Sequence, residues 1–158
     1  MHLDVTFLFQ EKEVQQPTSL PLGFALLLWA PLVMAQSNLG ELLDAGAKVL
    51  SAEEFRNEVV QRVIVGPTLA GGRIEVLYST KGSIQGVGIP RTAPTRSATP
   101  VNGEWKIDEN GKICTSMVIG DTFLPYRCQS WFKSGDQYFV SDVDSDRKAR
   151  VLLRTVKQ

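Results

Sequence analysis

Residues 103–119, which read GEWKIDENGKICTSMVI, decide the fold expected for this chain of 158 residues. Asn110-Gly111 is a strong hairpin signal, because both central residues of a type I′ turn need positive φ. On either side of it apolar and polar residues alternate, which is typical of half-buried strands. The stretch therefore predicts an antiparallel hairpin with a two-residue loop, in which Ile107 faces Cys114.

Cys114 and Cys128 are the only two cysteines of the chain. If a disulfide joins them as directly opposed residues of the next hairpin, the turn centres on Asp121, within residues 120–125. Such opposed residues lie close enough for the bond. Closing a loop of about 15 residues predicts roughly 3 kcal/mol of stabilisation. A redox-active pair is the alternative, although the usual C-x-x-C spacing is missing.

This register divides the apolar residues between the two faces of the sheet. One face would carry Trp105, Ile107, Cys114, Val118, Tyr126, Cys128 and Phe132. The other would carry Ile113, Met117, Ile119 and Trp131. The second face is too apolar for open water. We therefore expect helices to cover part of it through Leu42, Leu43, Phe55 and Val59.

Two helices are expected before the strands. Asn38 and Gly46 bracket a short helix over residues 39–45. Ser51 and Glu54 form a capping box, and apolar residues at helical spacing continue the second helix until Gly66-Pro67. Period-two alternation then predicts strands over residues 73–78, 83–89, 104–108, 112–119, 126–133, 137–143 and 149–156.

Residues 90–102 hold three prolines and only one large apolar residue, and so predict a long mobile loop. The fold class that follows is α+β, with two short N-terminal helices packed on a curved antiparallel sheet of about six strands. A partial barrel is the variant of this fold that the curvature favours.

The N-terminal region has the pattern of a secretion signal. Residues 20–34 are uncharged and apolar, but too few for the ~20 residues of a membrane span. Val33 and Ala35 are compact residues at the −3 and −1 positions that a signal peptidase accepts, which predicts cleavage between Ala35 and Gln36. Residues 1–35 would then be a signal peptide, and residues 36–158 a single periplasmic or secreted domain without a stable membrane anchor. An uncleaved anchor is the alternative. Acidic residues before the apolar run also suggest a true start downstream of Met1.

Loss of residues 1–35 limits the chemistry of the mature chain. The only histidine, His2, would leave with the signal, which excludes Ser-His-Asp and Cys-His catalysis and histidine-ligated metals. With 16 Lys and Arg against 14 Asp and Glu, the net charge would be about +2, too small to indicate nucleic-acid binding. We expect no enzyme activity, no cofactor and no metal.

Three acidic residues, Asp142, Asp144 and Asp146, superficially resemble the start of a calcium loop. An EF-hand needs glycine at the sixth position and glutamate at the twelfth, where this chain has Arg147 and Leu153. A solvated turn is therefore the preferred interpretation.

Two other sets of charged residues are candidates for function. Glu104 and Asp108 could act as an acid and base, but they share the polar face of one strand, where catalytic carboxylates lack a dry cleft. Arg91 and Arg96 could bind an anion or an acidic partner from the loop. The alternative is that these arginines only keep a proline-rich loop soluble.

Four aromatic residues are candidates for a ligand pocket between sheet and helices: Tyr78, Trp105, Trp131 and Tyr138. On strands of period two, such residues are more often part of the core. Both interpretations stay open at this point.

Several spaced motifs accompany these features. They are Leu43-x-x-Gly46, Leu50-Ser51-x-x-Glu54, Gly66-x-Thr68, Gly103-x-Trp105-x-Ile107-Asp108, Asn110-Gly111-x-Ile113-Cys114, Cys128-x-x-Trp131 and Gly135-Asp136-x-Tyr138. Over residues 42 to about 153 the pattern resembles a family of small exported proteobacterial proteins that is defined as a domain of unknown function. The resemblance implies a periplasmic or secreted single domain, with no catalytic residues to transfer.

The function expected from the sequence is a non-catalytic binding or envelope-associated module, whose partner is a protein or a small ligand of the cell envelope. The first alternative is a secreted inhibitor or effector that binds another protein through residues 90–102. A histidine-free hydrolase that uses carboxylates is the second.

Overall fold

The computed structural model describes residues 38–69, 71–89, 91 and 97–157. These residues belong to one compact unit, Met34–Gln158. They form two helices, α1 (Leu39–Asp44) and α2 (Ala52–Glu58). The strands are β1 (Lys48–Val49), β2 (Val63–Pro67), β3 (Arg73–Tyr78), β4 (Ser83–Ile89), β5 (Thr99–Ile107), β6 (Ile113–Ile119), β7 (Thr122–Ser134), β8 (Gln137–Ser141) and β9 (Leu152–Lys157).

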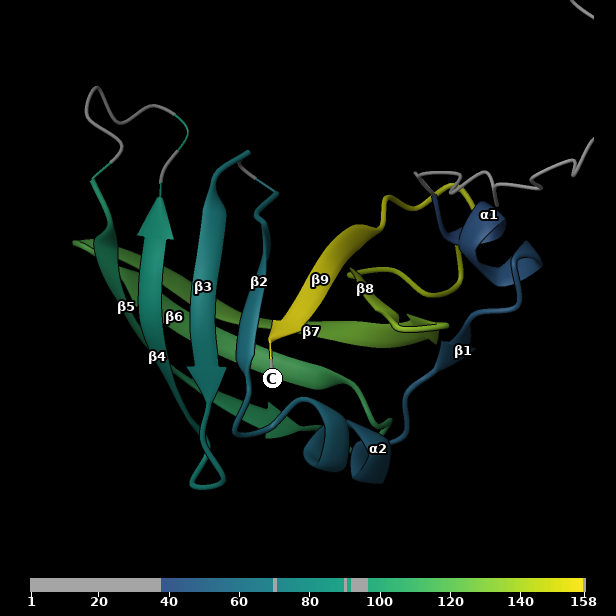
Figure 1. The fold of residues 1–158 in the computed structure, drawn as a ribbon, viewed down its shortest axis with the longest axis horizontal. Coiled ribbons are helices and arrows are strands. Elements are labelled where there is room, and N and C mark those ends of the chain that lie inside the picture. Colours follow the sequence, from purple (N-terminus) through teal and green to yellow (C-terminus); the bar gives the residue numbers. More distant parts are fainter. Residues whose placement is uncertain (1–37, 70, 90, 92–96, 158) are drawn as a thin grey trace, which may run out of the picture. The chain divides into compact units, whose positions relative to one another are not determined.

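Strands β2 to β9 form a closed, antiparallel eight-stranded barrel (Figure 1). Each strand pairs with the next one along the chain, and β9 returns to pair with β2. Strand β1 is an additional strand that pairs with β7. The α+β prediction of two helices on a sheet of about six strands is therefore wrong, since the described residues are mostly in strands and only 12% of them are helical.

The main error was at β2. The capping box is confirmed, because Ser51 and Glu54 exchange the two expected hydrogen bonds. Helix α2 nevertheless ends at Glu58, and Gln61 reverses the chain with a φ of 65°. The spacing of the apolar residues predicted a helix that continues to Gly66-Pro67. Instead, the β-branched residues from Val63 onward form β2, the strand that closes the barrel.

The hairpin of residues 103–119 exists, but its register differs by one residue from the prediction. Ile107 faces Ile113, and Cys114 faces Lys106. A shift of one residue moves every side chain to the other face. Ile113 therefore shares the barrel interior with Ile107 and Trp105, whereas Cys114 faces the other side of the strand.

The Asp108 side chain explains the shift. Its Oδ1 accepts hydrogen bonds from the backbone N–H groups of Asn110 and Lys112. The Asp108 N–H in turn donates to the Lys112 carbonyl, and the Gly111 N–H donates to the Asp108 carbonyl. This network lengthens the turn beyond the two residues that Asn110-Gly111 predicts.

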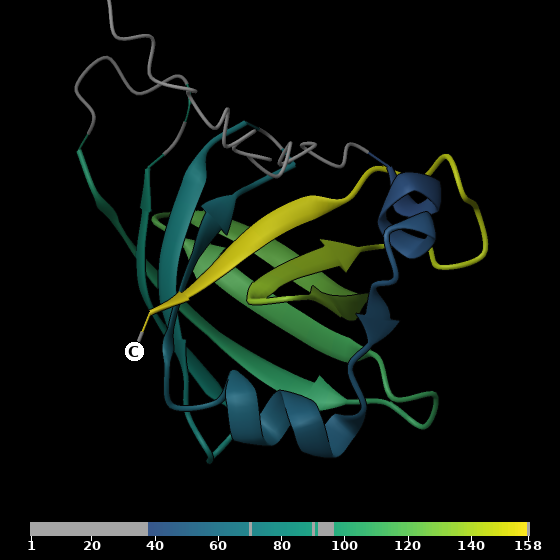
Figure 2. The same ribbon diagram turned by 45° about the vertical axis from the view of Figure 1, so that its right-hand side comes forward.

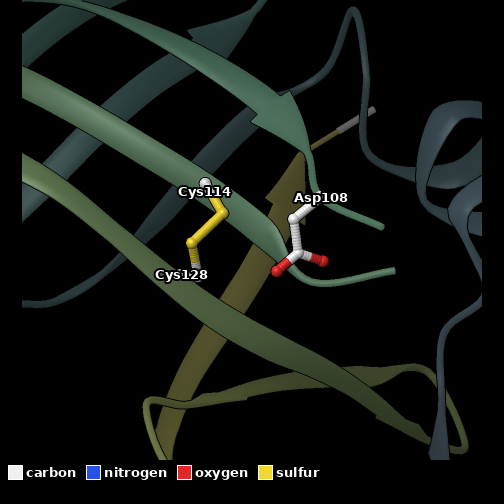
Figure 3. Close-up of side chains that lie close together, drawn as sticks. All are labelled: Asp108, Cys114 and Cys128. Carbon is white, nitrogen blue, oxygen red and sulfur yellow. A yellow bond between two sulfur atoms is a disulfide. The ribbon is translucent and has the colours of Figure 1, made fainter. Parts of the chain in front are cut away.

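The predicted disulfide is confirmed, and it joins Cys114 and Cys128 as opposed residues of β6 and β7 (Figure 3). The pairing continues to the turn, where Ile119 faces Thr122. A bulge between Thr115 and Met117 adjusts the register along the way.

Helix α2 lies across one end of the barrel (Figure 2). Its Phe55 is fully buried and makes edge-to-face contacts with Tyr78, Trp105 and Trp131. Trp131 is only 3% exposed, as the expectation of a covered face required. Together with surrounding aliphatic residues, these rings fill this end of the barrel.

Helix α1 packs elsewhere than the sequence suggested. Leu39 and Leu42 are fully buried in a second, smaller cluster with Phe132, Phe139 and Val151. On β7 and β8 these aromatic residues alternate with interior residues such as Trp131 and Val140. Helix α1 therefore covers the outside of the barrel, while α2 closes its end.

Replacing both cysteines by serine, in Cys114→Ser/Cys128→Ser, should lower the free energy of unfolding by about 3 kcal/mol. The physical reason is the freer unfolded chain, measurable by denaturant unfolding. Wild-type protein in dithiothreitol should match the variant, and the variant should not respond to the reductant. Equal stability of the oxidised protein and the variant would contradict a stabilising role.

Gly86→Ala should destabilise the barrel by about 2 kcal/mol or more. A Cβ atom at Gly86 would overlap the Glu75 carbonyl oxygen and the Val76 backbone, where β3 approaches β4. The matched control is Val87→Ala, whose side chain is exposed and whose effect should stay within about 0.5 kcal/mol. Thermal unfolding of both variants tests this, and similar midpoints would refute it.

Candidate ligand-binding site in the barrel

A cavity of about 850 Å³ occupies the end of the barrel opposite α2. Its mouth is lined by Thr68 and Leu69 after β2, by Ile89 and Thr99 at the ends of β4 and β5, and by Thr122 at the start of β7. The apolar part of the wall is built by Ile74, Met117, Ile119, Leu124 and Leu152.

The cavity exists because the two ends of the barrel are filled differently. Towards α2, the interior positions of β3, β5 and β7 carry Tyr78, Trp105 and Trp131. Towards the mouth, the lining has no such cluster of rings and includes smaller residues such as Ile74 of β3, Thr115 of β6 and Gly88 of β4. A barrel of eight strands has an interior just wide enough for its side chains or one small ligand.

Arg154 is the most buried charged residue of the cavity wall. It is 7% exposed and lies on β9 between Leu152 and Val156, which also point inward. Its Nη1 donates hydrogen bonds to the backbone carbonyls of Pro67 (2.8 Å) and Leu153 (3.1 Å). Within the part of the chain that the structure describes, no carboxylate forms an ion pair with it.

Gly66 makes room for this guanidinium. A Cβ atom there would lie 2.6 Å from Arg154 Nη1 and 2.6 Å from the Leu153 carbonyl oxygen. Gly66 belongs to β2, beside β9 in the barrel. The absence of a side chain at this position therefore allows Arg154 to lie against the barrel wall.

Burial changes the protonation equilibria around Arg154. Desolvation lowers the pKa of Arg154, and the neighbouring Tyr78 and Asp142 oppose this shift. Burial raises the pKa of Tyr78 to about 12, and the charge of Arg154 acts against that rise. Because an arginine side chain keeps its proton at neutral pH, a positive charge lies inside the barrel.

Asp142, the acidic side chain that acts electrostatically on Arg154, already has partners. Asp142 accepts a hydrogen bond from Gln129 Nε2 (2.6 Å) and forms an ion pair with Arg127 Nη1 (3.2 Å). Both Gln129 and Arg127 line the cavity. Among the described residues, Arg127 therefore has an ion-pair partner, whereas Arg154 has none.

The other acidic residues of the calcium-like sequence have separate partners. Asp144 forms an ion pair with Lys112 (2.9 Å) and accepts a hydrogen bond from Ser130. The hydrogen bonds from Lys112 and Ser130 lower the pKa of Asp144. Asp146 accepts from the backbone N–H of Lys148. Their carboxylates thus support local structure.

A second acidic group lies beside the disulfide. The Asp108 carboxylate and the sulfur atoms of Cys114 and Cys128 come within 4.8 Å of one another (Figure 3). The two sulfurs are bonded to each other, so they are not thiolate ligands. The Asp108 carboxylate accepts the turn hydrogen bonds described above.

The four aromatic candidates do not line the cavity. Tyr78, Trp105 and Trp131 form the aromatic cluster with Phe55. Tyr138 donates its hydroxyl hydrogen bond to Glu58 of α2 (2.6 Å). The structure therefore places these residues in the core and at the contact between α2 and the barrel.

The charged candidates have different locations. Arg91 lines the cavity at its mouth, where its side chain lies beside Gly71. Arg96 lies outside the described residues. Glu104 is exposed and accepts a hydrogen bond from the Tyr126 hydroxyl (3.0 Å). The Asp108 carboxylate accepts backbone hydrogen bonds within its own turn, so Glu104 and Asp108 have separate partners.

The remaining expectations concern segments that are only partly described. Ala35 and Gln36 lie outside the described residues, so the signal cleavage stays a prediction. Of the expected loop over residues 90–102, residues 99–102 belong to β5 and pair with β4. Residues 90 and 92–96 lie outside the described part.

Arg154 was missed by the sequence analysis. A signal was present, because Leu152-x-Arg154-x-Val156 places a cation on the apolar side of the last strand. This pattern could be recognised as part of a site only once β9 was known to close a barrel and to face a cavity.

No family model, curated protein or solved structure matches this chain. The resemblance to an exported family of unknown function therefore stays a prediction. Neither α1 nor α2, the helices of the described residues, has the length and apolar character of a membrane-spanning segment.

Glu58→Gln should destabilise the protein at pH 7. Hydrogen bonds from Lys133 (2.7 Å) and Tyr138 lower the pKa of Glu58 below its ordinary value of 4.5, and burial opposes them. A lowered pKa means that this contribution is present above about pH 4.5 and is lost as the pH falls through the folded-state value. The midpoint difference between wild type and variant should therefore shrink at acidic pH.

Thermal unfolding from pH 7 down to pH 3 measures this effect. The matched control is Glu53→Gln, at an exposed position of the same helix. Its midpoint should differ less from that of wild type at pH 7. A Glu58→Gln deficit that stays constant over the whole range would refute the assignment.

Proposed function

We propose that this protein is a non-catalytic binding protein that holds a small apolar or amphipathic molecule in its barrel. The observation that carries the proposal is the cavity of about 850 Å³ at the barrel end opposite α2. Ligand pockets typically measure roughly 300–1,000 Å³, are mostly apolar, and often lie in the mouths of β-barrels.

The lining favours binding over catalysis. Among the described residues of the cavity wall there is no carboxylate, imidazole, thiol or amine. These are the groups that most often supply general acid–base or nucleophilic catalysis. The polar groups that do line it are threonines, Tyr126, Gln129 and the arginines, and they suit hydrogen bonding and orientation of a ligand.

The setting expected for this activity is the periplasm or the medium, in line with the predicted signal peptide. An exported carrier of apolar molecules needs an interior that shields its ligand from water. The closed hydrogen bonding of the barrel supports such an interior, because no strand edge opens into the cavity.

Binding of N-phenyl-1-naphthylamine, a neutral fluorophore that brightens in apolar surroundings, tests the proposal. Wild-type protein should give a saturable increase in fluorescence. Met117→Trp should weaken binding about tenfold or more, because the indole would occupy the cavity that Met117 lines.

The matched control is Val118→Trp. Val118 is the next residue of β6, and its side chain is 39% exposed on the outside of the barrel. This variant should bind the fluorophore like wild type. Absence of saturable binding to wild type, or equal weakening in both variants, would overturn the proposal.

A further inference from the structure

The charged residues of the described cavity wall are all positive. Four arginines line the cavity, Arg73, Arg91, Arg127 and Arg154, and no acidic residue of the described wall opposes them. Arg127 is paired with Asp142. Arg73 and Arg91 are exposed, so water screens their charge. Arg154 is the exception, because it is both buried and without an ion pair among the described residues.

A buried charge without a counter-charge is costly, and proteins normally pair such groups. Here only Nη1 is satisfied, through the carbonyls of Pro67 and Leu153. The Nε–H and Nη2 donors make no hydrogen bond within the described part of the chain. In that part, no fully buried side-chain nitrogen lacks a partner. The two donors must therefore reach the open space of the cavity that Arg154 lines.

The geometry of these two donors matches that of a carboxylate. Nε–H and the neighbouring Nη2–H point in parallel from one edge of the planar guanidinium. A carboxylate accepts both bonds at once, which makes this pair stronger and more specific than a single contact. A ligand carboxylate would supply a directly bonded counter-charge, which no carboxylate of the described residues does.

Resting on the function proposed above, we propose that the ligand is a carboxylate-bearing amphiphile, a single carboxylate on a long apolar chain. Its carboxylate is bound by the free edge of Arg154, inside the barrel. Its apolar chain extends along Ile74, Met117, Ile119 and Leu124 towards the mouth. There the exposed Arg73 and Arg91 attract the anion before it enters.

Competition against N-phenyl-1-naphthylamine tests the assignment with dodecanoate and 1-dodecanol, which share a chain length and differ in charge. Wild-type protein should bind dodecanoate about tenfold or more tightly than 1-dodecanol. In Arg154→Met this preference should disappear through weaker binding of dodecanoate, while 1-dodecanol binds as before.

Arg56→Met is the matched control, because it removes an exposed arginine of α2, at the other end of the barrel and outside the cavity lining. Its preference for dodecanoate should stay within about twofold of wild type, since the side chain is screened by water. Loss of the preference in Arg73→Met with retention in Arg154→Met would place the carboxylate at the mouth and overturn the inference.

Arg154→Lys covers the case in which Arg154→Met does not fold. Lysine keeps the charge but offers no paired donors, so the preference should fall below that of wild type without vanishing.

The wild-type results separate the inference from the proposed function. A wild-type protein that binds N-phenyl-1-naphthylamine but does not prefer dodecanoate would refute this inference and leave the proposed function intact. Tighter binding of dodecyl phosphate than of dodecanoate would refute the carboxylate assignment. Failure of wild type to bind the fluorophore would instead refute the proposed function.

Discussion

The antiparallel pairing of β2 with β9 is the interaction on which the rest of this structure depends. Val63 faces Lys157 and Val65 faces Thr155, so the first and last strands of the barrel satisfy each other's backbone groups. An ion pair between Lys157 and Glu75 of β3 lies across the same region (2.9 Å). Without this pairing the sheet would have two exposed edges and no enclosed interior. Closure thus creates both the core and the cavity.

The two ends of the barrel interior have different roles, since one is packed and stabilises the fold and the other holds the cavity. At the α2 end, four aromatic rings pack edge to face, and Lys133 and Tyr138 hold Glu58 of the helix. This packing supplies the apolar burial that a small domain needs. The opposite end can therefore remain open and carry a buried charge. A binding site of this kind is destabilising by itself, and the filled end compensates for it.

Local features of the sequence predicted local structure well. The caps at Asn38 and Ser51 and the disulfide between Cys114 and Cys128 all follow from side chains close to the residues they affect. The errors arose where a single feature, local or tertiary, changed the placement of many residues. Asp108 lengthened a turn and reversed the faces of a hairpin, and a short β2 was concealed by helical spacing. Arg154 could not be recognised as a site residue, because its importance depends on closure.

The contact between Gly66 and Arg154 has a consequence for sequence variation. The guanidinium occupies the volume of a Cβ atom at position 66, on a strand 88 residues away along the chain. A larger residue at position 66 would displace the arginine. A small neutral residue at position 154 would remove only this contact, because the Leu153 carbonyl oxygen lies 2.6 Å from the same Cβ position. In homologous chains arginine at 154 should therefore occur together with glycine at 66, and the pair becomes a two-residue signature by which barrels with the same interior cation can be found.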